Sequence, residues 1–161
     1  MTTTDQATAL PAGPRGIGGW MILPILGLAA TVVTQLINLS TLGDSLGIAG
    51  QLDGPRQALI IAEIVGNALI FLILPIVLLV LVTQKKRNFP RLYVVYSVVG
   101  AVFFVLDLIL GYALFAEVYN SGSAEFFDSN TLRGIGGALA GLLIWTPYML
   151  NSVRVKNTFV N

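Results

Sequence analysis

Four long apolar stretches limit what this chain can fold into more than any other feature of its sequence. They cover residues 17–42, 57–82, 92–116 and 131–152. A helix of roughly 20 apolar residues is long enough to cross the hydrocarbon core of a bilayer. Only 11% of the residues are charged, against about 25% in an ordinary soluble protein. The sequence therefore predicts an all-α integral membrane protein, in which a bundle of four transmembrane helices takes up most of the 161 residues.

The segments outside these stretches are short. Residues 1–16 are polar and lack the basic start and short apolar core of a signal peptide, so we expect a disordered cytoplasmic tail. Residues 17–152 are expected to form a single transmembrane domain, and residues 153–161 a second cytoplasmic tail. No internal repeat relates the two halves, so the sequence gives no support to a transporter built from inverted repeats.

Two connections carry signals for the start of a helix. The glycine-rich connection at 43–55 ends in Asp53-Gly54-Pro55, where an acidic cap and a proline in the first turn favour the start of the second helix. In the connection at 117–130, Ser129 or Asn130 is placed to cap the fourth helix. Both connections are therefore expected to be short loops between antiparallel helices.

Basic residues are sorted between the two sides in a way that predicts the orientation in the membrane. The basic loop, Thr83 to Arg91, lies between the second and third apolar stretches. Its side of the membrane also holds both ends of the chain and has Arg15, Lys85, Lys86, Arg87, Arg91, Arg154 and Lys156, whereas the other side has only Arg56 and Arg133. Because Lys and Arg keep short loops on the cytoplasmic side, we expect both termini and the basic loop to be cytoplasmic.

The sequence contains no cysteine and no histidine. Their absence removes disulfides, thiolate nucleophiles, imidazole bases and the most common ligands of zinc and haem. An aspartyl dyad within the membrane would need Glu63 as the partner of Asp107, and nothing else in the sequence supports one. We therefore expect no catalytic residue, no metal site, no cofactor and no enzymatic activity.

Six polar or charged side chains fall in the half of the membrane domain that lies away from the basic loop. They are Gln35, Asn38, Glu63, Asn67, Asp107 and Arg133. At 1.5 Å per residue, Asp107 lies roughly 13 Å inside its helix, where a carboxyl group needs a partner or a proton. The six residues can converge on a cavity for an ion, a proton or a small polar ligand, or on an interhelical hydrogen-bond clasp. The clasp is the more common use of such residues.

Glycines form a second pattern, along the third and fourth apolar stretches. Gly100 and Gly111 lie on one face of the third helix, and Gly134, Gly137 and Gly141 crowd one half of the fourth. The spacing from Gly137 to Gly141 permits two helix backbones to approach closely. We expect these five glycines to pack helices together, either within the chain or against another chain.

Three segments carry a family resemblance. They are Ile17-Gly18-Gly19-Trp20-Met21-Ile22-Leu23-Pro24, Phe89-Pro90-Arg91-Leu92-Tyr93, and Ile144-Trp145-Thr146-Pro147-Tyr148-Met149-Leu150 followed by Val153-Arg154-Val155-Lys156-Asn157-Thr158-Phe159-Val160. Together they resemble a bacterial family of small four-helix membrane proteins of unknown function, number 2569 in the domain-of-unknown-function series. The resemblance implies the fold and no reaction. The matched motifs cluster at the cytoplasmic helix ends, which suggests a contact surface made by Trp20, Pro90, Arg91, Trp145, Pro147, Tyr148, Arg154 and Lys156.

Two functional hypotheses follow from these patterns. The first is an accessory or assembly subunit of a larger complex in the bacterial inner membrane, because the chain has no catalytic constellation, no soluble domain and only short loops. The second is a small oligomeric transporter or channel that uses the polar cluster around Asp107. The partners we expect are the lipid bilayer, another membrane protein and further copies of the chain, but no nucleic acid.

Overall fold

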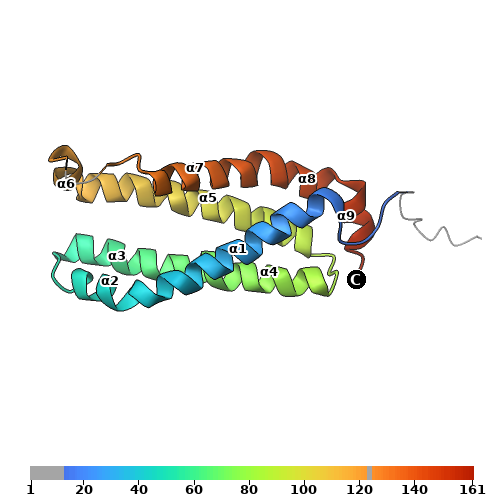
Figure 1. Cartoon of the computed structure of the whole chain (residues 1–161), viewed down its shortest axis with the longest axis horizontal. Helices are drawn as coiled ribbons and strands as arrows, with labels where there is room; N and C mark the ends of the chain where they lie inside the picture. The colour runs from blue at the N-terminus through green and yellow to red at the C-terminus, as the bar shows by residue number, and fades with distance from the viewer. Residues whose placement is uncertain (1–12, 123–124) are drawn as a thin grey trace, which may run out of the picture.

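Most of the helices join end to end into four rods. The computed structural model describes residues 13–122 and 125–161, and every regular element in these ranges is helical. The first rod joins η1 (Gly19–Met21), α1 (Ile22–Asn38), η2 (Leu39–Thr41) and α2 (Leu42–Ala49), and the second joins α3 (Gly54–Gly66), η3 (Asn67–Ile73) and α4 (Leu74–Thr83). The third rod is α5 (Phe89–Leu114), and the fourth joins α7 (Ser129–Ala140), η4 (Gly141–Trp145) and α8 (Thr146–Asn151). Two short helices, α6 (Ala116–Asn120) and α9 (Val153–Thr158), lie at opposite ends of the molecule, here called the α6 end and the α9 end (Figure 1).

Three of the rods, Gly19–Ala49, Gly54–Thr83 and Phe89–Leu114, are long and apolar enough to cross a membrane. The fourth rod is not among them, although it is helical from residue 129 to residue 151. Its composition explains the difference, because it contains Arg133 and a run of glycines. The structure therefore confirms the all-helical prediction and provides three candidate crossings.

The first rod is longer than its sequence predicts. We expected a helix over residues 17–42 and a loop over 43–55, but the helix continues through α2 to Ala49. Where α1, η2 and α2 join, two hydroxyl groups donate hydrogen bonds to carbonyls of the preceding turn. Ser40 donates to the Ile37 carbonyl at 2.7 Å, and Thr41 donates to the Asn38 carbonyl at 2.9 Å. Backbone hydrogen bonding thus outweighs the cost of about 1 kcal/mol for each glycine in a helix.

The caps of the second and fourth rods differ in kind. Asp53 occupies the N-cap of α3 and a proline follows in the first turn, as predicted, but the carboxylate makes no capping hydrogen bond. The fourth rod is capped by Asp128, and not by Ser129 or Asn130 as predicted. The Thr131 N–H donates to Asp128 Oδ1 at 2.7 Å, and this bond lowers the pKa of the carboxyl group.

Two prolines shape the middle of the second and fourth rods. Pro75 and Pro147 each stand just after a π-helical segment, η3 or η4. A proline has no N–H and its ring crowds the carbonyl one turn earlier, so the wider π turn relieves that contact. In η4 the Gly141 carbonyl accepts hydrogen bonds from the Thr146 backbone N–H and also from the Thr146 hydroxyl, the latter at 2.9 Å.

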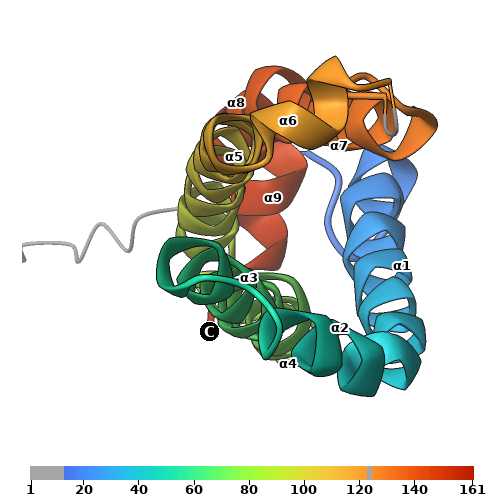
Figure 2. The ribbon, with the colours of Figure 1, turned by 90° about the vertical axis from the view of Figure 1, so that its left-hand side faces the viewer.

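The rods pack in a row that does not close through helix contacts. α1 packs on η3 and α4, the second rod packs on α5, and α5 packs on α7, η4 and α8. Viewed along the rods, α1 and α5 lie on opposite sides, with α3 and α4 between them (Figure 2). No comparable helix contact joins α1 to α7 in the described part of the chain. The space between α1 and α7 is called the α1–α7 seam below.

The hydrophobic core lies at the α9 end. Its buried members are Met21, Leu28, Leu78, Val82, Phe89, Tyr93, Met149, Val155 and Phe159. The Phe159 ring lies 4.6 Å from the Phe89 ring, and the Arg87 N–H donates to the Asn161 carbonyl at 2.7 Å. The C-terminal segment 153–161, for which we expected a cytoplasmic tail, is therefore packed into the core, and its side of the membrane stays a prediction.

The start of the described chain packs at the same end. The Gly16 N–H donates to the Thr158 hydroxyl at 2.9 Å. Residues 13–16 therefore also depart from the predicted disordered tail, whereas residues 1–12 lie outside the described residues. The N-terminal segment and the basic loop are thus both hydrogen-bonded to the C-terminal segment at the α9 end.

Candidate functional site

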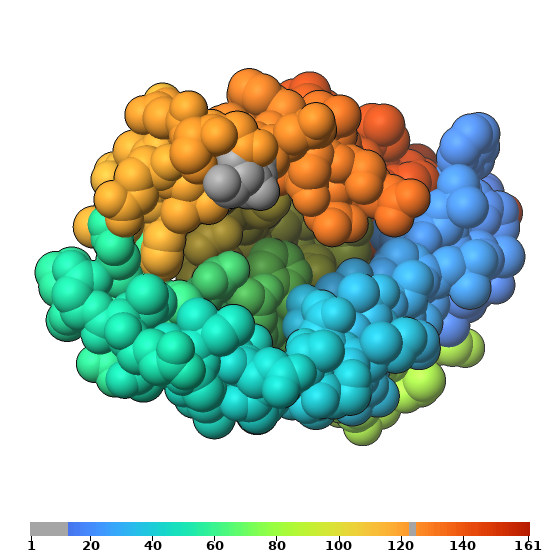
Figure 3. Space-filling model, turned by 60° about the vertical axis from the view of Figure 1, so that its left-hand side comes forward, coloured from blue at the N-terminus to red at the C-terminus, as the bar shows by residue number. Residues whose placement is uncertain are grey.

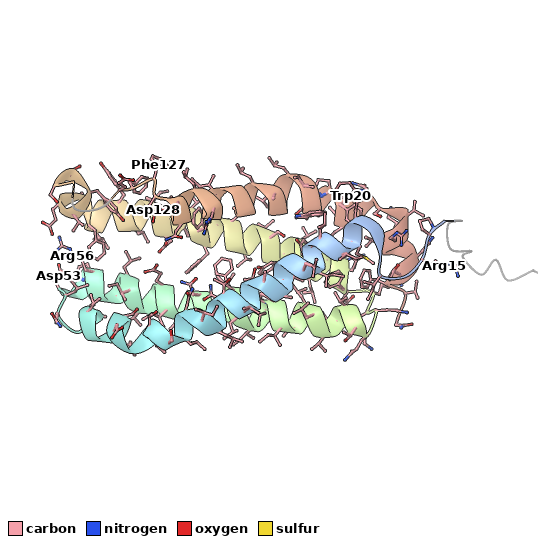
Figure 4. The ribbon with its side chains drawn as sticks, viewed as in Figure 1. Arg15, Trp20, Asp53, Arg56, Phe127 and Asp128 are labelled. Atoms are coloured by element: carbon pink, nitrogen blue, oxygen red, sulfur yellow. The ribbon has the colours of Figure 1, made fainter. Side chains whose placement is uncertain are left out.

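The basic residues gather at the α9 end of the molecule. Lys85, Lys86 and Arg87 lie in the loop between α4 and α5, and Arg154 and Lys156 lie on α9. The Arg154 guanidinium also lies close to the backbone at the start of the first rod. A Cβ added at Gly18 would lie only 3.1 Å from Arg154 Nη1. Arg15 and Trp20 lie at this end too (Figure 4). The residues predicted as a contact surface share this end, and Trp20 among them is 70% exposed.

A polar cavity of about 470 Å³, called the outer cavity below, lies toward the α6 end, between the first rod and α3–η3. Its polar lining comes from Gln35, Asn38, Thr41, Ser45, Glu63 and Asn67. This volume is within the range of small-molecule sites in proteins. Figure 3 shows the molecule hollowed on this side, between the blue and teal helices α1 and α2 and the orange helices α6 and α7.

Four of the six predicted polar residues line this outer cavity together: Gln35, Asn38, Glu63 and Asn67. The side chain of Asn67 makes one hydrogen bond within its own rod, where its Nδ2 donates to the Glu63 carbonyl at 2.8 Å. Asp107 is not in the cavity wall, but it lies close enough to Glu63 for the two carboxylates to interact electrostatically.

Arg133 does not join the cluster as predicted. It is exposed, it does not line the cavity, and it makes no ion pair with Glu63 or Asp107 among the described residues. Arg133 lies outside the cluster because α7 contacts α5 through the face that carries Gly134. Gly134 packs against the Phe104 ring, and neighbouring positions on a helix point in different directions.

The sequence reasoning missed a cluster around Arg56 at the α6 end. Arg56 Nη2 lies 2.6 Å from Glu117 Oε1, and Arg56 Nε donates to the Leu114 carbonyl at 2.9 Å. The guanidinium also lies 5.6 Å from the centre of the Phe115 ring and 3.7 Å from Asp53 Oδ1 (Figure 4). These contacts join the start of α3 to the end of α5 and to α6. The signal available in the sequence was a lone arginine opposite an acidic connection.

The glycines divide into packed and open positions. Gly100 lies against the Phe71 ring, Gly134 lies against Phe104, and Gly141 faces Ser97. Gly111 and Gly137 have open space where a side chain would be. Three of the five glycines therefore pack within the chain, whereas for Gly111 and Gly137 packing against another chain stays a prediction. Gly66, which the sequence did not single out, packs most tightly, against the Phe103 ring.

A second cavity, of about 380 Å³, lies in the α1–α7 seam nearer the α9 end. Its wall is formed by α1, η3, α5 and the fourth rod, and it has no charged side chain. Trp145 and Gly137 belong to this wall. The two cavities thus differ in chemistry, because one has a carboxylate and amides and the other has rings, methyl groups and hydroxyls.

The fold and these cavities define the class of the molecule, an all-helical protein of the multi-pass membrane type. Within that class, the chain belongs to the family described as protein of unknown function (DUF2569), whose family model matches residues 14–160. The family resemblance seen in the sequence is thereby confirmed. No curated protein and no solved structure matches the chain significantly.

Proposed function

We propose that the chain crosses the bacterial inner membrane four times, with both termini and the basic loop in the cytoplasm. The fourth rod, residues 129–151, makes the fourth crossing. In support of this, α7, η4 and α8 each pack on α5, and the rod follows α5 along most of its length (Figure 1). A helix of modest hydropathy is better accommodated in a bilayer when a neighbouring helix covers its small residues, and α5 covers Gly134 and Gly141.

The function that the geometry supports best is binding of a small polar cation in the outer cavity, as the recognition step of a small transporter or channel. The observation that carries this is the outer cavity itself, where Glu63 shares a wall with Gln35, Asn38 and Asn67. Polar and ionisable residues within a membrane are costly, and they mark pathways for ions and solutes more often than random positions do.

Charge favours a cationic occupant. Glu63 and Asp107 are close enough to interact electrostatically, and no ion pair among the described residues joins either carboxylate to Lys or Arg. Two carboxylates without a basic partner attract a positive charge, and amide oxygens from Gln35 and Asn38 can complete its hydrogen bonding. The hydrophobic core lies at the α9 end, away from this cavity, so we expect the site to be reached from the outer side.

Thermal stabilisation of the purified protein tests this proposal. Sodium, potassium, methylammonium, guanidinium and choline are titrated into the protein in detergent while the unfolding temperature is followed. A ligand present at 100 times its Kd stabilises the folded state by about 2.7 kcal/mol. We expect at least one cation to raise the unfolding temperature in a saturable way, and Glu63→Gln to remove that rise.

The matched control is Asp44→Asn, which removes an exposed carboxylate at the same end of the molecule but outside the outer cavity. It should leave the cation response unchanged. Uptake of the same cation into proteoliposomes then separates a transporter from a binding protein. A flat response to all five cations, or one that Glu63→Gln leaves intact, contradicts the proposal.

A second candidate function is an accessory or assembly subunit that binds another membrane protein. The observation that favours it is the outer face of the fourth rod, where Leu139, Leu143 and Ile144 are 51%, 69% and 57% exposed. This rod is the least apolar of the four, so a protein neighbour would support it better than lipid alone. Neither candidate involves catalysis or a cofactor.

Purification in mild detergent tests the second candidate. A partner subunit should copurify with the chain, and Leu143→Arg on the exposed face should release it, while Val33→Arg on the exposed face of α1 should not. Isolation of the chain by itself, or only as a homo-oligomer, contradicts the accessory role.

A further inference from the structure

The apolar cavity in the α1–α7 seam has features of a ligand site that the outer cavity does not explain. Leu23 and Gly27 of α1 form one side of it, and Gly137 of α7 forms the opposite side. All three residues are exposed, so the cavity opens sideways between the rods. In a membrane this opening faces the hydrocarbon region, from which a lipid-soluble molecule can enter.

One buried hydroxyl group in this cavity makes no hydrogen bond of standard geometry. Ser97 is 7% exposed, and its Oγ is fully buried without a hydrogen bond of standard geometry. The Tyr93 hydroxyl lies one turn away on α5 and interacts with it, so the two hydroxyls together have one donor left for a ligand. A buried hydroxyl without a hydrogen bond costs about 1–3 kcal/mol, which an acceptor atom on a ligand would recover.

Other hydrogen-bonding and aromatic groups surround this serine. The hydroxyl groups of Tyr96 and Thr31 interact across the cavity, between α5 and α1. The Trp145 indole and the Phe104 ring contribute flat aromatic surfaces to the wall. Hydroxyl donors beside ring faces suit a flat, uncharged molecule that carries carbonyl oxygens.

We propose that this cavity binds the ring of a lipid-soluble quinone. The absence of charged side chains from the cavity wall disfavours phosphate and carboxylate head groups. A quinone ring presents carbonyl acceptors and no donors, which matches a wall where the adjacent hydroxyls of Ser97 and Tyr93 have one donor left between them. The volume of about 380 Å³ suits a ring of this size, and the sideways opening lets the isoprenoid tail pass into the lipid.

Two neighbouring glycines supply a matched pair of variants. Gly136 and Gly137 are both exposed, and neither has an atom within 4 Å of the position of an added Cβ. Only Gly137 lines the seam cavity. Gly137→Leu therefore places a side chain in the proposed site, whereas Gly136→Leu makes the same chemical change on the surface of the same helix.

Fluorescence quenching of Trp145 measures the binding. Trp20 lies outside the cavity and is replaced by Phe, so that Trp145 gives the whole tryptophan signal. A decyl-substituted benzoquinone is titrated into the protein in phosphatidylcholine nanodiscs. We expect saturable quenching, a Kd raised at least tenfold by Gly137→Leu, and a Kd within twofold of the parent for Gly136→Leu.

Ser97→Ala tests the hydrogen bond itself and serves if Gly137→Leu fails to fold. Loss of one hydrogen bond of about 1 kcal/mol raises the Kd roughly fivefold. Quenching that stays linear with quinone concentration contradicts the proposal, as does equal weakening by the two leucine variants. Displacement of the quinone by decanol with equal efficiency in the parent and in Ser97→Ala identifies a site for acyl chains and also overturns it.

Discussion

The contact between Gly66 and Phe103 makes the sharpest prediction about how the rods are held together. Gly66 is buried on α3, and a Cβ at this position would overlap the Phe103 ring of α5. The ring is held from another side by Phe71, whose centroid lies 6.1 Å away in an edge-on arrangement. Replacing Gly66 by alanine therefore forces α3 and α5 apart or drives Phe103 out of its position.

The magnitude follows from two opposing effects. Overpacking a tight contact costs about 1–3 kcal/mol, whereas exchanging glycine for alanine in a helix interior gains up to about 1 kcal/mol. With the full gain subtracted, Gly66→Ala should therefore lower the free energy of unfolding by up to about 2 kcal/mol. Gly111→Ala, on the facing helix α5 with open space at its Cβ position, should be neutral or slightly stabilising.

A double-mutant cycle with Phe103→Ala tests the cause of this loss. Unfolding is followed by helical circular dichroism in a fixed detergent as SDS is added. In the Phe103→Ala background, Gly66→Ala should no longer destabilise the protein, which gives a coupling energy of about 1–2 kcal/mol. If Gly66→Ala is as harmless as Gly111→Ala, or equally harmful in both backgrounds, the packing argument is wrong.

Three further predictions concern the ends of the molecule. Arg56→Gln should cost about 0.5–1 kcal/mol, because the pair with Glu117 is partly exposed, and thermal melts should show a smaller loss at high salt. Phe159→Ala should cost about 3–5 kcal/mol in the same melts, while Val160→Ala, 47% exposed, should cost almost nothing. The hydrogen bond from the Thr131 N–H lowers the pKa of Asp128 in the folded protein. The contribution of this cap to stability is therefore complete above the ordinary aspartate pKa of about 3.9, and it is lost as pH falls through the lower pKa of the folded state. Amide exchange at Thr131 should therefore lose protection below about pH 4 in the parent, and Asp128→Ala should remove this pH dependence.

The apolar stretches predicted the rods well because long runs of this kind have few alternatives in a membrane. The basic loop was also placed correctly between α4 and α5. The extension of the first rod to Ala49 was missed because three glycines between 43 and 50 indicate a loop. The role of the C-terminal segment was missed for a different reason. Val155 and Phe159 belong to a short segment that the sequence predicts as a tail. They are buried by contacts with residues distant in the sequence, such as Phe89, which a local pattern does not show.

The polar cluster was predictable in part. The depth of a residue along a helix follows from counting, so Gln35, Glu63 and Asn67 were expected in the same half of the membrane domain, and they share the outer cavity. The direction in which a side chain points depends on which neighbour each rod packs against. That neighbour is not encoded locally, so Arg133 was wrongly included. The seam cavity could not be foreseen, because it arises from the missing contact between α1 and α7.

Cysteine accessibility measures the proposed topology most directly, because the chain has no cysteine of its own. Single substitutions Gln51→Cys, Lys86→Cys, Asn130→Cys and Lys156→Cys, all at exposed positions, are treated in intact cells with a membrane-impermeant maleimide. Four crossings with a cytoplasmic basic loop predict labelling at positions 51 and 130, and protection at 86 and 156 until the membrane is opened. Labelling at position 86 from outside contradicts the orientation. Labelling at both 130 and 156 from outside contradicts the fourth crossing.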